Sequence, residues 1–326
     1  MKIWSLQSLR FFAALAVVIY HADSEIFQAT HRLGVLGLRG AMLGQAGVDL
    51  FFVLSGVVIA TSSAGLSAKA FAVKRATRIL PLYAAVAVLY LTARLFAGVL
   101  DWREVVSTVF LWPALDRMTD PLVPVAWTLC FEMLFYASTA LVLWRPRLIW
   151  PLGAIFVAAL ATRSVPLTRF IGNPLILEFL MGVALTRIPK AAGGVALIPV
   201  GMALLWFFGA TGYPTTTGAL DGEMVWQRVL YLGLPAAMIV WGTMQISARR
   251  GVLTYLGDTS YALYLSHAPV VVAVSYLLCR WTALPVDAIA VAATVASVLL
   301  AWRIHELVEK PLLAWIRRPA KQPALA

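Results

Sequence analysis

The chain has 326 residues, of which 61% are hydrophobic and 13% are charged. This apolar content far exceeds what the core of a soluble domain requires, so the composition predicts a membrane protein with several spans. The net charge of +11 is explained by the sidedness of membrane-protein loops, and we expect no nucleic-acid partner. The two cysteines, Cys130 and Cys279, fall inside predicted spans without a His or Cys cluster at ligand spacing, so we predict neither a disulfide nor a metal site.

Apolar segments of roughly membrane-spanning length recur along the whole chain, each bounded by Arg, Lys, Gly or Pro. This pattern predicts an all-α transmembrane bundle, because a β-barrel would need short alternating strands instead. About ten spans are predicted, at residues 8–27, 45–62, 81–100, 125–144, 148–163, 173–187, 194–210, 228–247, 258–279 and 284–304. The spans at 148–163 and 173–187 are short, which favours a tilted, re-entrant or buried segment there.

The basic residues predict the orientation of the bundle. With the N-terminus in the cytoplasm, the inner side receives 17 of the 26 Lys and Arg residues. The positive-inside rule therefore predicts cytoplasmic termini and a multi-pass protein of the inner (plasma) membrane, in contact with lipid. No long polar linker or internal repeat interrupts the chain, so we predict one transmembrane domain over residues 1–312 and a basic cytoplasmic tail over 313–326.

The first predicted span contains Arg10 and, eleven residues later, His21. At about 100° per residue, eleven residues make about three turns, so both side chains point to one face of the helix, about 16 Å apart along its axis. An ionisable pair within a span is costly and normally faces a bundle interior or an aqueous cavity, which makes this pair a candidate functional site. The alternative is an interfacial arginine and a single hydrogen-bonded histidine.

A basic segment lies between the second and third predicted spans, with Lys69, Lys74, Arg75 and Arg78. Arg75 and Arg78 are three residues apart, so on a helical turn they share a face and can hold one polyanion, such as a nucleotide phosphate. The alternative is ordinary attraction to anionic lipid headgroups. Glu306 and Glu309, at the cytoplasmic end of the last span, are expected to brace these arginines, unless they only form a solvated helix end.

Several other spans carry ionisable groups, namely Asp49, Glu132, Glu178 and His267. The predicted orientation places His21 and the three carboxylates in the outer half and His267 near the middle, which favours one polar cavity opening outward. A histidine beside carboxylates is a good general base, and we expect Asp49 or Glu132 to orient His21. Each carboxylate has the alternative of a hydrogen bond between helices.

The order of these motifs resembles the membrane-bound acyltransferase family 3 over residues 8–311. The resemblance rests on Arg10 and His21, the segment 47–56 (GVDLFFVLSG), Arg75 and Arg78 followed by Pro81 and Tyr83, Trp127-Thr-Leu-x-x-Glu132 with Tyr136, the segment 257–267 (GDTSYALYLSH), and Glu309-Lys-Pro311. Within the family, the opening Gln7-Ser-Leu-Arg10 and the stretch that begins at Trp127 most resemble bacterial exopolysaccharide O-acetyltransferases.

The resemblance implies transfer of an acetyl or other acyl group from cytoplasmic acetyl-CoA to a hydroxyl of an extracytoplasmic or lipid-linked carbohydrate, such as an exopolysaccharide unit. It implies that His21 is the catalytic residue, with Arg10 as its companion, and that Arg75 and Arg78 serve the donor. Our candidate site has His21, Glu132 and Asp49 as catalytic residues, Arg10, Arg75 and Arg78 for the donor, and Trp127, Tyr136, Glu178 and His267 for the acceptor. Polysaccharide-assembly proteins are candidate partners.

Two other functions are consistent with ten spans around a polar cavity. A transporter or flippase of a small polar or lipid-linked substrate would normally show repeated halves, and the sequence shows no such repeat. A sensor that only binds acyl-CoA would not need a histidine gathered with carboxylates. For an acyltransferase, direct transfer and transfer through an acyl-enzyme both fit, and we favour the direct route because no serine–base pairing in the sequence demands a covalent intermediate.

Overall fold

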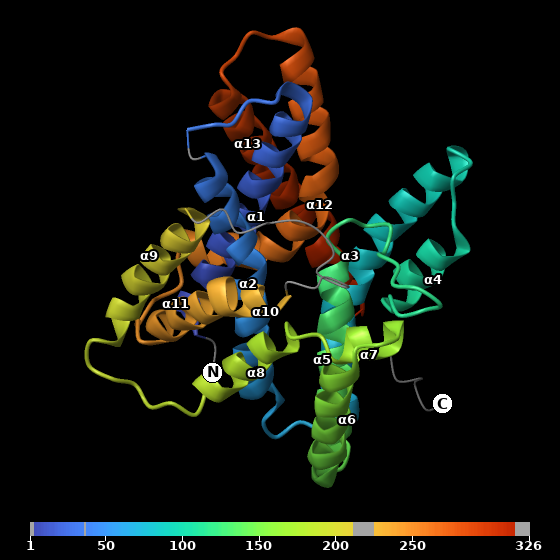
Figure 1. Ribbon diagram of the computed structural model, residues 1–326, viewed down its shortest axis with the longest axis vertical. Coiled ribbons are helices and arrows are strands. Elements are labelled where there is room, and N and C mark those ends of the chain that lie inside the picture. The colour runs from blue at the N-terminus through green and yellow to red at the C-terminus, as the bar shows by residue number, and fades with distance from the viewer. Residues whose placement is uncertain (1–2, 36, 211–224, 317–326) are drawn as a thin grey trace, which may run out of the picture.

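The computed structural model describes residues 3–35, 37–210 and 225–316. This part of the chain forms helices and no strands, which confirms the predicted all-α class (Figure 1). The helical elements are α1 (Trp4–Thr30), α2 (Gly37–Ser63), α3 (Ala68–Phe96), α4 (Trp102–Phe110), α5 (Trp127–Trp144), η1 (Pro146–Leu148), α6 (Ile149–Thr162), α7 (Pro166–Ile171), α8 (Ile176–Leu185), η2 (Gly194–Ala196), α9 (Leu197–Ala210), α10 (Val225–Arg228), η3 (Val229–Gly233), α11 (Leu234–Met244), α12 (Val252–Trp281), α13 (Val286–Ile304), η4 (His305–Glu309) and α14 (Lys310–Ile316). Residues 317–326 of the predicted tail lie outside the described residues.

Seven helical segments in the described residues are long and apolar enough to cross a membrane. They are Trp4–Thr30, Leu43–Ser63, Ala68–Phe96, Trp127–Trp144, Pro166–Leu185, Val252–Trp281 and Val286–Ile316. The predicted spans 148–163 and 194–210 coincide with the shorter apolar helices Pro146–Thr162 and Gly194–Phe208, and the predicted span 228–247 overlaps η3 and α11. The count of ten spans and the cytoplasmic termini stay predictions.

The third span begins earlier than its hydrophobic pattern indicates. The Ser67 hydroxyl caps α3 by accepting a hydrogen bond from the Ala70 N–H at 3.2 Å, so the helix starts at Ala68 rather than near residue 81. The basic segment therefore forms the first turns of α3, where its charges dilute the apolar pattern. Arg75 and Arg78 consequently lie on one helix, as their spacing predicts.

The centre of the bundle is α1, which packs between α2 and α12, with α13 against α12 (Figure 1). Two glycines allow this close packing. A Cβ at Gly47 of α2 would lie 2.4 Å from the Ala13 carbonyl oxygen, and one at Gly257 of α12 would lie 1.9 Å from the Gln7 carbonyl oxygen. Both distances are far below van der Waals contact, so the two helices can approach α1 only because these positions lack a side chain.

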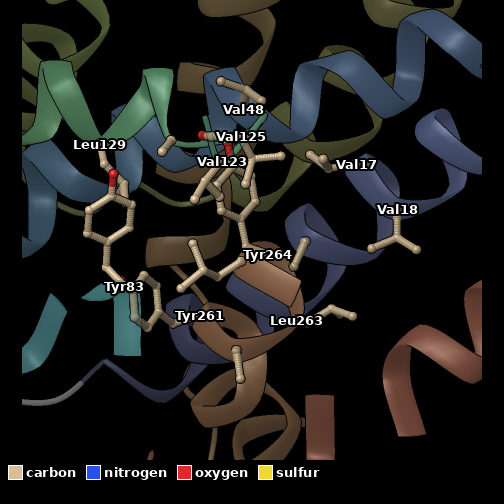
Figure 2. Close-up of a cluster of buried hydrophobic side chains, with 14 of the residues drawn as sticks. Val17, Val18, Val48, Tyr83, Val123, Val125, Leu129, Tyr261, Leu263 and Tyr264 are labelled. Carbon is tan, nitrogen blue, oxygen red and sulfur yellow. Dashed lines mark hydrogen bonds between the residues drawn. The ribbon is translucent and has the colours of Figure 1, made fainter. Parts of the chain in front are cut away.

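A continuous apolar core surrounds the meeting point of α1, α2, α3, α5 and α12. Figure 2 shows Tyr261, Leu263 and Tyr264 of α12 in this core, with Val17 and Val18 of α1 and with Val123 and Val125 from the segment before α5. The Tyr264 hydroxyl is 3.2 Å from the Val125 carbonyl oxygen and 2.9 Å from the Thr128 hydroxyl. These hydrogen bonds connect α12 to the start of α5.

Candidate active site

The helices α1, α2, α3, α5 and α12 enclose a cavity of about 300 Å³. Its lining includes four basic side chains, Arg10, Lys74, Arg75 and Arg78, and one carboxylate, Glu132. The rest of the lining is largely apolar, with aromatic side chains such as Phe51, Tyr136, Tyr261 and Tyr264. Positive charge therefore exceeds negative charge on the walls of the cavity, which favours an anionic ligand.

Arg75 is held in the cavity by contacts from α2 and by two aromatic rings. Its guanidinium donates hydrogen bonds to the Ser62 hydroxyl and to the Val58 carbonyl oxygen, the latter at 3.3 Å. It also lies 5.5 Å from the centroid of the Phe71 ring and 5.3 Å from that of Tyr136. Within the described residues, the buried Nε of Arg75 has no hydrogen-bond partner. Arg75 is thus fixed in position while part of its donor capacity is unused.

Arg78 is held by an ion pair with Glu309, as the sequence predicts. The two side chains form an ion pair in which Glu309 is 1% exposed and Arg78 is 28% exposed. The second carboxylate oxygen of Glu309 lies 2.7 Å from His305 Nδ1. Both residues belong to the π-helical turn η4. Glu306 does not brace the arginines, because its carboxylate accepts from the Tyr255 hydroxyl and the Lys310 ammonium instead.

Glu132 lies with the basic residues of the cavity. Its carboxylate accepts hydrogen bonds from the Tyr136 hydroxyl and from the Ser55 hydroxyl, the latter at 3.3 Å. Arg10 interacts with the charges of Glu132, Arg75 and Arg78, and it makes no hydrogen bond within the described residues. The guanidinium of Arg10 is therefore available to a ligand in the cavity.

His21 contacts a second histidine rather than a carboxylate. Its Nδ1 lies 3.0 Å from Nε2 of His267 on α12 and 3.0 Å from the Val17 carbonyl oxygen of α1. This corrects the expectation that Asp49 or Glu132 orients His21. Glu132 is hydrogen-bonded to Tyr136 and Ser55, and Asp49 is hydrogen-bonded to Arg228. The histidine pair is outside the lining of the cavity, one helical turn along α12 from Tyr264, and the Tyr264 and His267 ring centroids are 6.1 Å apart.

Asp49 and Glu178 form a separate cluster with Arg228, in which both carboxylates are fully buried and Arg228 is partly buried. Asp49 of α2 accepts two hydrogen bonds from Arg228 of α10, at 3.0 and 2.8 Å. Glu178 of α8 is 0% exposed, as is Asp49, and packs against Gly233. The expectation of one outward-opening cavity with five ionisable groups is therefore wrong. Those groups divide among the basic cavity, the histidine pair and this cluster.

Two predicted acceptor-binding residues, Trp127 and Tyr136, differ in their position relative to the cavity. Trp127 packs on the rings of Phe52 and Phe131, with centroids 6.1 and 6.3 Å away, and is not part of the cavity lining, whereas Tyr136 is.

Sequence reasoning missed Arg228, although an arginine at the start of an apolar segment was a usable signal. It also missed Ser55 and Ser62, because a serine in a span carries no distinctive pattern.

The chain matches the acyltransferase domain family over residues 3–304. It therefore belongs to this family and is an O-acyltransferase embedded in the membrane. The chain is 31% identical to the exopolysaccharide production protein ExoZ of Rhizobium meliloti, over 83% of this chain and 90% of that protein. It is 26% identical to the acyltransferase MdmB of Streptomyces mycarofaciens, over 97% of this chain and 93% of that protein. No solved structure matches the chain.

Proposed function

We propose that this protein transfers an acetyl group from cytoplasmic acetyl-CoA to a hydroxyl of an extracytoplasmic or lipid-linked carbohydrate, with His21 as general base. The observation that carries the proposal is the basic cavity, which lies one helical turn along α12 from the histidine pair. An acyltransferase needs a place for the donor and a base for the acceptor. The cavity and the histidine pair supply these two parts.

The cavity suits the phosphates and thin arm of coenzyme A. Arg75 and Arg78 lie on one face of α3, and the planar guanidinium group pairs well with phosphate oxygens. The volume of about 300 Å³ is at the lower end of ligand pockets, roughly 300–1,000 Å³, and fits the pantetheine arm better than the whole donor. The nucleotide would then stay near Lys74, with the short acetyl end directed toward Tyr264. With a cytoplasmic N-terminus, the end of the cavity at Lys74 faces the cytoplasmic pool of acetyl-CoA.

The acceptor would approach from the opposite side of the membrane. The similarity to an exopolysaccharide production protein supports a carbohydrate hydroxyl as the acceptor. Our proposal also includes an inner-membrane location and polysaccharide-assembly proteins as partners. Neither Glu178 nor Trp127 lines the cavity. We therefore withdraw Glu178 and Trp127 from the acceptor site. We assign Asp49, which is paired with Arg228, to the stability of the bundle, and Glu132 to the cavity, where it holds Tyr136 beside Arg75.

In the direct reaction, Nε2 of His21 removes the proton from the acceptor hydroxyl as the oxygen attacks the thioester carbonyl carbon. The new C–O bond forms and the C–S bond breaks. The leaving thiolate of coenzyme A then takes the proton from His21, so the base is regenerated. A carboxylic ester and free coenzyme A are the only products, and no other co-reactant is needed.

Two assays on the same variants test this proposal. Purified protein in lipid nanodiscs is given radiolabelled acetyl-CoA and the surface polysaccharide of cells that lack the gene. In parallel, surface polysaccharide from cells with wild-type protein, His21→Ala or no gene is analysed by mass spectrometry. We expect His21→Ala to lower transfer by about 10²- to 10⁴-fold and to remove an acetyl ester from the polysaccharide. Unchanged acetylation in His21→Ala cells would overturn the proposal, and changed export without changed acetylation would favour a transporter.

A further inference from the structure

We propose that His267 is a positioning residue. Through a hydrogen bond between the two imidazoles, it holds His21 in the tautomer whose Nδ1 carries the hydrogen and whose Nε2 is bare, that is, unprotonated. The inference rests on the proposed role of His21 as base. This positioning role replaces the sequence-based prediction that His267 binds the acceptor. The carboxylate that orients a catalytic histidine in many enzymes is here replaced by a second, neutral histidine.

The tautomer of His267 follows from its own helix. Its Nδ1 lies 2.8 Å from the Tyr264 carbonyl oxygen and 3.1 Å from the Leu263 carbonyl oxygen. Carbonyl oxygens only accept hydrogen bonds, so Nδ1 must carry the hydrogen. In the neutral ring Nε2 is then bare and acts only as an acceptor.

The tautomer of His21 follows from that of His267. Nδ1 of His21 lies 3.0 Å from the bare Nε2 of His267, so a hydrogen bond requires the hydrogen on His21 Nδ1. The Val17 carbonyl oxygen, also at 3.0 Å from this atom, demands the same assignment. Nε2 of His21 is left with its lone pair and makes no hydrogen bond within the described residues. This is the atom that would take the acceptor's proton.

The surroundings of the pair favour a neutral partner. His267 is 0% exposed, and both of its ring nitrogens are occupied, so it has no free atom for a substrate. The rings that face the pair are Tyr264, beside His267, and Tyr20, with its centroid 5.0 Å from that of His21. When His21 gains a proton in the reaction, its Nδ1–H still donates to His267, and the bond becomes charge-assisted. The pair therefore stabilises the imidazolium without a buried carboxylate.

The contact depends on the close approach of α12 to α1. Gly257 allows this approach where α12 crosses the Gln7 carbonyl, and His267 lies on the same helix ten residues later. Ser266, next to His267, donates only to the Ala262 carbonyl oxygen of its own helix. Ser266→Ala is therefore a matched control at the same depth.

The direct test is solid-state NMR of the full-length protein, labelled with ¹⁵N-histidine, in lipid bilayers. The chain has only four histidines, so single His variants assign the signals. We expect protonated Nδ1 and bare Nε2 in both His21 and His267, with a ¹⁵N–¹⁵N coupling across the hydrogen bond. A proton on Nε2 of His21, or no coupling between the rings, would overturn the proposal.

Kinetics of His267 variants provide the second test. We expect His267→Leu to lower kcat about 10²-fold with an unchanged KM for acetyl-CoA and an altered pH profile of kcat. His267→Gln, whose amide oxygen can accept from His21, should recover most of that loss, and Ser266→Ala should behave as wild type. Equal losses in the Leu and Gln variants, or a wild-type kcat in His267→Leu, would refute a positioning role. If His21→Ala itself retains transfer, the proposed function fails, whereas the NMR result still decides the hydrogen bond.

Discussion

The bundle contains two groups of arginine and carboxylate side chains that differ in how their charges are balanced. In the cavity, four basic side chains share the lining with one carboxylate, and Arg10 has no hydrogen bond within the described residues. In the other group, Arg228 is bonded twice to Asp49, with Glu178 beside them, and both carboxylates are 0% exposed. The same residue types therefore produce an open anion site in one place and, between Asp49 and Arg228, a closed structural contact in the other, beside which the carboxylate of Glu178 has no hydrogen-bond partner within the described residues.

An ionisable residue within a span is a functional candidate only until its partner is known. A buried charge that is balanced by its neighbours has little left to offer a ligand, although removing one partner is costly. An excess of charge around a cavity has the opposite meaning, because the missing counter-charge can come from the ligand.

The largest expected effect on stability is in the buried cluster. Asp49→Ala leaves Arg228 without its carboxylate, so we expect the free energy of unfolding to fall by about 3–5 kcal/mol. Thermal unfolding in detergent measures the change. Glu104→Ala is the matched control, because it breaks a more exposed pair with Arg94, for which about 0–1 kcal/mol is expected. Equal losses in the two variants would contradict the distinction between the clusters.

The cavity arginines are expected to affect donor binding, and Arg78→Ala should also lower the free energy of unfolding because it leaves the buried Glu309 without its cation. Arg75→Ala or Arg78→Ala removes a charged hydrogen bond of about 1.5–3 kcal/mol, which corresponds to a KM for acetyl-CoA raised about 10- to 100-fold. The rise should be smaller at high salt, where the wild-type attraction is already screened. Initial rates at several donor concentrations measure it, with Arg94→Ala as a control outside the cavity. A wild-type KM in both cavity variants would exclude these arginines from donor binding.

The smallest expected effect concerns the ion pair between Arg103 of α4 and Asp116, which lies in the segment between α4 and α5. The Arg103 guanidinium donates to Asp116 and lowers the pKa of that carboxyl to about 2, below the value of about 3.9 in an unfolded chain. The pair therefore stabilises the fold above about pH 4, and the contribution is lost as the pH falls toward 2. We expect the melting temperatures of wild type and Asp116→Asn to differ slightly at neutral pH and to converge in acid. A constant difference at all pH values would argue against this ion pair.

Much of the fold could be predicted because hydrophobicity and helical periodicity act along the chain. The apolar segments mark the helices, and the spacing of Arg75 and Arg78 places both on one face of α3 and in one cavity. The start of α3 was predicted too late, because its first turns are basic and are defined by a cap at Ser67 rather than by hydrophobicity.

The partners of the site residues could not be predicted, because they depend on contacts between helices. The hydrogen bond from His21 to His267 needs the close approach that Gly257 allows, and no spacing within one helix encodes it. Asp49 was assigned to His21 by its depth, yet depth does not say which neighbouring helix a side chain faces. Arg228 satisfies that carboxylate from α10.

Calorimetric binding of coenzyme A to the His21→Ala and Arg75→Ala proteins separates the two parts of the site, because the cavity is proposed to bind the donor and the histidine pair to perform the chemistry. We expect His21→Ala to keep the wild-type Kd although its acetyl transfer is about 10²- to 10⁴-fold slower, and Arg75→Ala to bind coenzyme A at least about tenfold more weakly. Loss of binding in His21→Ala together with wild-type binding in Arg75→Ala would contradict this assignment of the two parts.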